Sequence, residues 1–220
     1  MPPKTIVYVT AYYPPFGAGG AERTVALHAR ILARSGRSVL VITPQYGNSS
    51  REIIDGVRII RFPFHRLSGL GTQVPPQRFL CASYHRYLAV QIINAVQGEP
   101  VLCLQAQDVY SMIGTEMAAR RLGVPFLTYI RDTASLCGLG AICLMEAGRE
   151  SPPPFCGVRQ HLSCAFRRYF PIYEPRASIA GRLFILGSLG AAYVLFRRRQ
   201  RVNRGAARII FNSEGFRRVH

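Results

Sequence analysis

A chain of 220 residues, of which 49% are hydrophobic, can bury a substantial core, and this excludes a wholly disordered protein. The formal net charge of +17 at pH 7 favours anionic partners, such as phosphorylated substrates or an acidic membrane surface. The sequence shows neither a zinc-finger spacing of Cys and His nor an isolated basic recognition helix. Nucleic acid is therefore the least favoured partner.

Short apolar runs and helical patterns alternate along the first 130 residues. Apolar runs rich in β-branched residues predict strands at 4–11, 38–43, 57–62, 101–104 and 124–130. Apolar residues at helical intervals predict helices at 20–35, 78–96 and 110–122. Gly36 and Gly123 are placed to end two of these helices. The alternation predicts an α/β fold: a Rossmann-like, doubly wound, mainly parallel sheet with both faces buried.

The regular pattern breaks after Asp132. Residues 133–177 are rich in Cys and Pro and show no clear period, so we expect an irregular insertion within a single domain spanning 1–220. A long helix is then predicted at 178–204 and a strand at 208–211, with Ser213 as the N-cap of a further helix. Because the chain ends inside that helix, we expect a truncated product or a partial sequence.

Three glycines, Gly17, Gly19 and Gly20, stand where the first predicted strand meets the first predicted helix. In a doubly wound sheet, ligands bind at the carboxyl ends of the strands, and glycine lets them approach the backbone closely. The helix N-terminus adds free N–H groups and a positive dipole end, which suit a phosphate or diphosphate. The G-x-G-G spacing is neither the dinucleotide motif nor a P-loop, so a tight turn that binds nothing is the alternative.

The segment YYPPFGAGGAERTVALHARILARSGRSVLVIT resembles the start of family 4 glycosyltransferases of the GT-B fold. The matching residues are Pro14, Pro15, Gly19, Gly20, Ala21, Glu22, Leu32, Ala33, Gly36, Val39, Val41 and Thr43. The later segments RLGVPFLTYIRD and ARIIFNSEGF also fall where the N-terminal domain of that family has similar segments.

The resemblance implies that residues 1–220 form the N-terminal, acceptor-side domain of a hexosyltransferase-type enzyme. Such an enzyme transfers a sugar from a nucleotide-sugar, its co-substrate, to a glycan or lipid-linked acceptor. The donor domain would follow in a C-terminal half that is absent here, so we expect the chain to be inactive alone and to hold no cofactor. A non-catalytic sugar- or phosphate-binding Rossmann module at a membrane is the alternative.

The resemblance also implies which residues line the cleft of this enzyme. The glycine turn, with Gly17, Gly19 and Gly20, would lie near the donor diphosphate and the transferred sugar. Glu22 and Arg23 follow in the first helical turn and could reach the same cleft. For Glu22, the alternative is an acid that stabilises the helix N-terminus.

Polar residues follow two other predicted strands. Gln105 and Gln107 stand where relatives often carry His, and we expect them to contact the acceptor. Arg131 and Asp132 stand where many relatives carry His-Asp. Because Arg131 cannot act as a base near pH 7, we expect it to stabilise charge on a diphosphate leaving group. An Arg-Asp pair that supports the loop is the alternative.

The cysteines of the predicted insertion are Cys137, Cys143, Cys156 and Cys164. Four thiolates could hold a structural zinc ion, with His161 as a substitute ligand. None of the spacings is the tight C-x(2–4)-C of zinc knuckles, so unlinked thiols in a loop are the alternative.

An apolar run of 14 residues, Leu183–Phe196, precedes the basic segment RRRQRVNR. A membrane-spanning helix needs about 20 apolar residues, so this run does not span a membrane by itself. It is compatible with a buried core helix or with a helix that lies on an anionic membrane. Because no signal sequence begins the chain, we expect a cytoplasmic protein, associated in the second case with the cytoplasmic face of a membrane.

Overall fold

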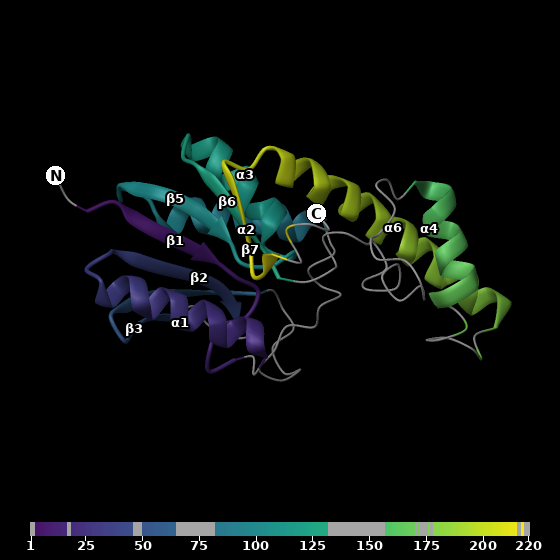
Figure 1. The fold of residues 1–220 in the computed structure, drawn as a ribbon, viewed down its shortest axis with the longest axis horizontal. Helices are drawn as coiled ribbons and strands as arrows, with labels where there is room; N and C mark the ends of the chain where they lie inside the picture. Colours follow the sequence, from purple (N-terminus) through teal and green to yellow (C-terminus); the bar gives the residue numbers. More distant parts are fainter. Residues whose placement is uncertain are drawn as a thin grey trace. The chain divides into compact units, whose positions relative to one another are not determined.

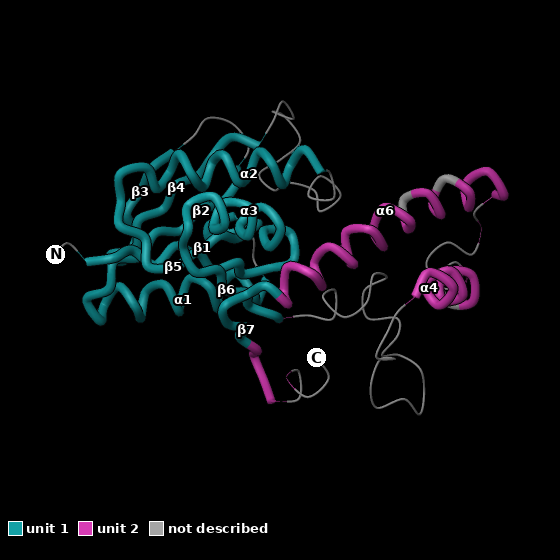
Figure 2. Tube along the Cα trace, turned by 90° about the horizontal axis from the view of Figure 1, so that it is seen from above, with its two compact units in different colours: residues 1–130, 205–210 teal, residues 131–204, 211–220 magenta. Residues whose placement is uncertain are grey.

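The computed structural model describes residues 3–16, 19–45, 50–64, 82–131, 157–169, 171, 176, 178–214 and 217 (Figure 1). The chain divides into two compact units, coloured separately in Figure 2. The first unit contains residues 1–130 and 205–210, and the second contains residues 131–204 and 211–220. The single domain predicted over residues 1–220 stays a prediction.

The first unit is built on a seven-stranded sheet in the order β3-β4-β2-β1-β5-β6-β7. The pairings of β1 with β2, β1 with β5, β2 with β4 and β5 with β6 are parallel, whereas β3 and β4 are antiparallel. The predicted mainly parallel, Rossmann-like sheet is therefore confirmed. The strands are β1 Thr5–Val9, β2 Val39–Gln45, β3 Ser50–Ile54, β4 Val57–Pro63, β5 Val101–Ala106, β6 Phe126–Ile130 and β7 Arg208–Phe211.

The edge strand β3 is absent from the sequence prediction. Its sequence, SREII, has two charged residues and is largely exposed, because an edge strand buries little of its surface. The signal for this strand lies in the turn that follows it. Asp55 and Gly56 both have positive φ, at 52° and 79°, as in the two-residue turns that favour β-hairpins.

Helices connect the parallel strands and cover both faces of the sheet. They are α1 Gly20–Arg34, α2 Ala82–Ala95 and α3 Met112–Leu122. Helix α1 lies on one face of the sheet, and the adjacent α2 and α3 lie on the other (Figure 2). The predicted helix stops are confirmed, because Gly36 and Gly123 adopt positive φ values of 81° and 66°.

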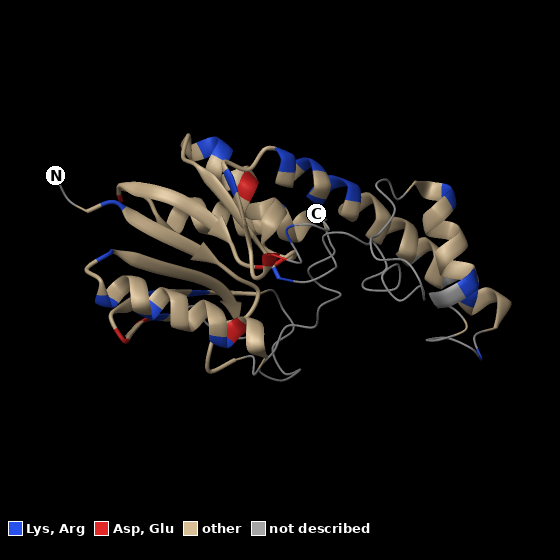
Figure 3. Cartoon of the chain, in the orientation of Figure 1, with Lys and Arg blue, Asp and Glu red and all other residues tan. Residues whose placement is uncertain are grey.

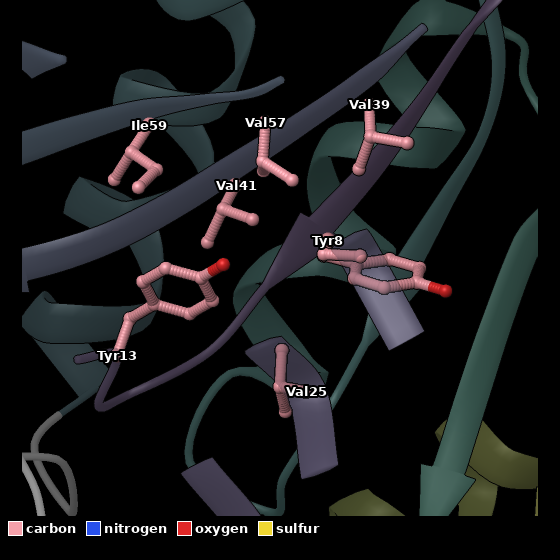
Figure 4. Close-up of a cluster of buried hydrophobic side chains, with 8 residues drawn as sticks. Tyr8, Tyr13, Val25, Val39, Val41, Val57 and Ile59 are labelled. Carbon is pink, nitrogen blue, oxygen red and sulfur yellow. The ribbon is translucent and has the colours of Figure 1, made fainter. Parts of the chain in front are cut away.

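A cluster of buried side chains fixes α1 to the sheet (Figure 4). Each of its larger apolar side chains stabilises the fold by about 1.5–3 kcal/mol when fully buried. The cluster therefore holds α1 against the sheet through Val25 and Ala29. Its members are Tyr8, Tyr13, Val25, Ala29, Val39, Val41, Val57 and Ile59.

The second unit is helical in its described part. It contains α4 Val158–Cys164, a π-helical turn at Ala165–Tyr169 and α6 Ile179–Arg204, which confirms the long predicted helix. The predicted irregular insertion at 133–177 is wrong for residues 158–169. Val158, Leu162 and Phe166 recur there at helical spacing, and Gly157 is the N-cap of α4.

Candidate functional site

The turn between β1 and α1 lies at the carboxyl edge of the parallel sheet. Gly19 is the N-cap of α1 and has an extended conformation, and Gly20 is the first helical residue. A Cβ atom added to Gly20 would meet nothing within 4 Å, so the backbone of the first helical turn is accessible. Gly17 lies outside the described residues. The geometry agrees with a helix N-terminus that is open to a ligand.

The carboxylate of Glu22 folds back over Gly19. A Cβ atom added to Gly19 would clash with Glu22 Oε2, which is buried and has no hydrogen-bond partner among the described residues. An acid in this position is stabilised by the positive end of the helix dipole. Glu22 would have to swing aside before an anionic ligand reached Gly19. Arg23 is exposed, and its backbone N–H donates to Gly19 O at 3.3 Å.

A buried arginine of β4, which sequence reasoning missed, holds the loop that leads to this turn. Arg61 is only 1% exposed, forms an ion pair with Glu52 and donates hydrogen bonds to the carbonyl oxygens of Tyr13 and Pro14. Its guanidinium carbon also lies 5.9 Å from the ring centre of Tyr13 and 5.1 Å from that of Phe16. These contacts fix the segment between β1 and the glycine turn.

A small pocket opens beside this loop. It has a volume of about 420 Å³, and the apolar residues that line it include Ala26 and Val57. Polar groups on its wall include Arg30 and Asp55, which form an ion pair at 2.9 Å. Burial raises the pKa of Tyr13, which also lines the pocket, while the nearby arginines act in the opposite direction. The Tyr13 side chain is therefore neutral at physiological pH.

Asp108 connects the ends of β1 and β5 at the same edge. Its Oδ2 accepts hydrogen bonds from the Thr10 hydroxyl and the Ala11 N–H, at 3.0 and 2.7 Å. Its Oδ1 accepts from the N–H groups of Tyr110 and Ser111, at 2.9 and 2.8 Å, immediately before α3. The carboxylate therefore positions the loop after β1 and the start of a helix together.

The two predicted acceptor contacts in this region are buried. Gln105 lies within β5 and is 6% exposed, and Gln107 follows the strand and is 1% exposed. The backbone N–H of Gln107 donates to Val9 O at 2.9 Å, which extends the pairing of β5 with β1. Their role toward an acceptor stays a prediction.

Arg131 directly follows β6, the strand that pairs in parallel with β5. The carboxyl end of β6 therefore lies at the same edge of the sheet as the carboxyl end of β1. Arg131 is half-buried, and its carbonyl oxygen accepts a hydrogen bond from Asn212 Nδ2 at 3.4 Å. It belongs to the second unit, so its contact with the glycine turn stays a prediction. Asp132 lies outside the described residues.

The predicted zinc site receives no support from the described part of the chain. Cys137, Cys143 and Cys156 lie outside it, and Cys164 is a free, half-buried thiol. His161, the substitute ligand, is buried, with Nε2 3.1 Å from Leu189 O. Among the described residues, no group of three or more His, Cys, Asp or Glu side chains is arranged to hold a metal ion.

The chain is similar to known glycosyltransferases. The family model described as glycosyl transferase 4-like domain matches residues 19–219. Among solved structures, the chain is similar to a variant of Os79 from O. sativa in complex with UDP, with 15% identity, a TM-score of 0.53, and coverage of 94% of this chain and 46% of that one. It is also similar to a UDP-glucosyltransferase from Polygonum tinctorium, with 15% identity, a TM-score of 0.52, and coverage of 96% and 47%. Among the curated proteins, none matches the chain.

These similarities carry different weight. At 15% identity, the solved structures show that the fold is shared, and the chain spans about half of their length. The family model extends over nearly all of the chain, from the N-cap of α1 to beyond β7. The chain therefore belongs to the glycosyl transferase 4-like domain family, as the resemblance of its N-terminal segment predicted.

Proposed function

We propose that the chain is the acceptor-side domain of a nucleotide-sugar-dependent glycosyltransferase of the hexosyltransferase type. The acceptor would be a glycan or a lipid-linked molecule, and the reaction would take place on the cytoplasmic side. The observation that carries the proposal is the open N-terminus of α1, which lies at the ligand-binding edge of the sheet in a member of this family.

In this proposal, the chain supplies one wall of the cleft. The backbone of Gly20 and the positive end of the α1 dipole would face the diphosphate of the donor. Arg131 would add a full positive charge that stabilises the developing charge of the leaving group. The side chain of Glu22 would turn away from Gly19 when the donor binds, because two anions repel each other at one helix end.

The donor would be held mainly by a second domain. The two solved structures named above are about twice as long as the segments that this chain covers, and the Os79 structure contains UDP. We therefore expect the nucleotide to bind between this domain and a donor domain outside residues 1–220. Arg61 and Asp108 would keep the loop before the glycine turn in one conformation, so that the cleft is formed before the substrates arrive.

The experiment is a transfer assay with radiolabelled UDP-, GDP-, ADP- and dTDP-sugars. Glycan and polyprenyl-phosphate acceptors would be offered to the complete enzyme and, separately, to residues 1–220. We expect transfer from one donor class by the complete enzyme and no transfer by residues 1–220. Binding of a sugar or phosphate without transfer by the complete enzyme would contradict the proposal and favour a non-catalytic binding module.

A further inference from the structure

The described helices of the second unit carry exposed apolar side chains. By length and composition alone, helix α6 is a candidate membrane helix, and only 19% of its apolar 18-residue stretch is buried. A core helix of a soluble protein would instead bury most of its apolar surface. The exposed surface of α6 therefore requires an explanation beyond the packing of the described residues.

The exposed apolar residues of α6 form one stripe. Leu183 and Val194 are 64% and 65% exposed, and the exposed Gly187 and Gly190 lie between them on the same face. Ile179, at the beginning of the helix, is 81% exposed. Within the described residues, nothing covers this stripe, which is apolar over about three turns.

Helix α4 and the π-helical turn that follows it carry a second stripe of the same kind. Val158, Leu162 and Phe166 follow one another at intervals of four residues and are all exposed, from 42% to 56%. On another side, this segment packs against α6: Ala165 of the π-helical turn is buried with Leu189, and the ring centroid of His161 in α4 lies 4.9 Å from that of Tyr193. The two helices thus bury a small common core and direct larger apolar side chains outward.

The charges beside these stripes are all positive. The C-terminal part of α6 is rich in arginine (Figure 3). By their helical spacing, the exposed Arg198 and Arg201 continue the face that carries Leu183 and Val194. Arg159 and Arg167 flank the stripe of α4 and are exposed. Neither α4 nor α6 contains an Asp or a Glu. Apolar surface on described helices whose only charged side chains are arginines is complementary to an anionic lipid bilayer.

We propose that α4 and α6 form a membrane anchor, which inserts into one leaflet of a bilayer rich in anionic phospholipid. The apolar stripes would contact acyl chains, and the exposed Arg198 and Arg201 would bind lipid phosphates. At 1.5 Å per residue, Leu183–Phe196 is about 21 Å long. The hydrocarbon core of a bilayer is thicker, at about 30 Å. Arg182 and the short α4 also favour insertion into one leaflet over a full span.

The test is flotation of the 220-residue chain with lipid vesicles. We expect the chain to float with vesicles of phosphatidylglycerol and phosphatidylcholine, and at least about tenfold less with pure phosphatidylcholine. The double variant Leu183→Glu and Val194→Glu should reduce flotation at least about tenfold. The matched control is Leu27→Glu and Ile31→Glu on α1, whose side chains are 51% and 54% exposed, and it should float like the native chain.

Fluorescence separates insertion from adsorption by charge alone. The chain has no tryptophan, so Val194→Trp and Leu27→Trp each introduce a single reporter. We expect anionic vesicles to shift the emission of Trp to shorter wavelength only when it replaces Val194. A chain that does not float with anionic vesicles, or a Val194→Trp emission that they leave unchanged, would overturn the proposal. A blue shift of the Val194→Trp emission that appears without vesicles and grows with protein concentration would instead show that a second copy of the chain covers the stripe of α6.

Discussion

The Asp108 carboxylate accepts a hydrogen bond of 2.7 Å from the backbone N–H of Ala11, which lies 97 residues earlier in the chain. This bond joins the carboxyl ends of β1, the central strand of the sheet, and of its neighbour β5. The loop after Ala11 leads directly to the glycine turn and α1. The position of the candidate site therefore depends on a contact between distant parts of the sequence.

Replacing Asp108 with Asn should lower the free energy of unfolding by about 1–3 kcal/mol. The amide nitrogen cannot accept a hydrogen bond, so at least one pair of donors at this edge loses its acceptor. The control is Asp55→Asn, which removes a solvent-exposed ion pair with Arg30 and should cost less than about 1 kcal/mol. Urea denaturation measures both values, and equal losses would contradict the structural role of Asp108.

Replacing Arg61 with Met should lower the free energy of unfolding by roughly 2–3 kcal/mol. Removing one partner of a fully buried ion pair costs about 3–5 kcal/mol, and the loss is smaller here because Glu52 is 34% exposed. Arg51→Met, at an exposed position of the neighbouring strand, should change stability by less than about 0.5 kcal/mol.

The same variant should also loosen the loop that Arg61 holds. The N–H of Phe16 donates to Tyr13 O at 3.1 Å, and its hydrogen exchange reports on the loop. We expect faster exchange at Phe16 in the Arg61→Met protein and an unchanged rate in the Arg51→Met protein. An unchanged rate in both proteins would show that Arg61 does not order this segment.

The pair of Glu99 and Arg58 should make stability depend on acidic pH. Hydrogen bonds from Arg58, at 2.7 and 2.8 Å, lower the pKa of Glu99 below its usual value, against the effect of partial burial. A carboxyl group with a lowered folded-state pKa stabilises the protein above its unfolded-state pKa. This stability is lost as pH falls through the folded-state pKa.

The measurement compares the native protein with Glu99→Gln by urea denaturation at a series of pH values. At neutral pH the native protein should be more stable by up to about 1 kcal/mol, because both side chains remain partly exposed. The difference should shrink at pH values below the usual range for glutamate. A difference that stays constant down to pH 3 would show that the ion pair contributes no stability.

The order of strands and helices was predictable because parallel strands buried on both faces leave a strong local pattern. The runs that became β1, β2 and β5 are almost wholly apolar, and the glycines after α1 and α3 mark helix ends. The edge strand β3 and the helix α4 were missed. β3 contains charged residues and buries little of its surface. α4 has only seven residues and lies next to a Cys- and Pro-rich segment without a clear period, so its helical pattern was too short to be recognised.

The candidate site was predictable only where one segment contains it. The glycine turn and α1 are contiguous, so their spacing indicated a helix N-terminus open to a ligand. Arg61 and Asp108 were not identified as the residues that hold this turn, because their partners lie 47 and 97 residues away. Arg61 also shares its strand with Arg58, which is only partly buried, and the sequence gives no sign that Arg61 alone is fully buried.

The most direct measurement compares glycosyl transfer and unfolding in the Gly20→Val form of the complete enzyme. Because an added Cβ at Gly20 meets no neighbouring atom, the variant should keep its thermal midpoint to within a few degrees. The added methyl groups would occupy the space of the ligand, and we predict that kcat/KM falls at least about tenfold, or about 1.4 kcal/mol. The control is Gly157→Val at the N-cap of α4, where an added Cβ also meets no neighbouring atom. This variant should retain full activity. A Gly20→Val enzyme with native kcat/KM would contradict the assignment of this turn to the reaction cleft.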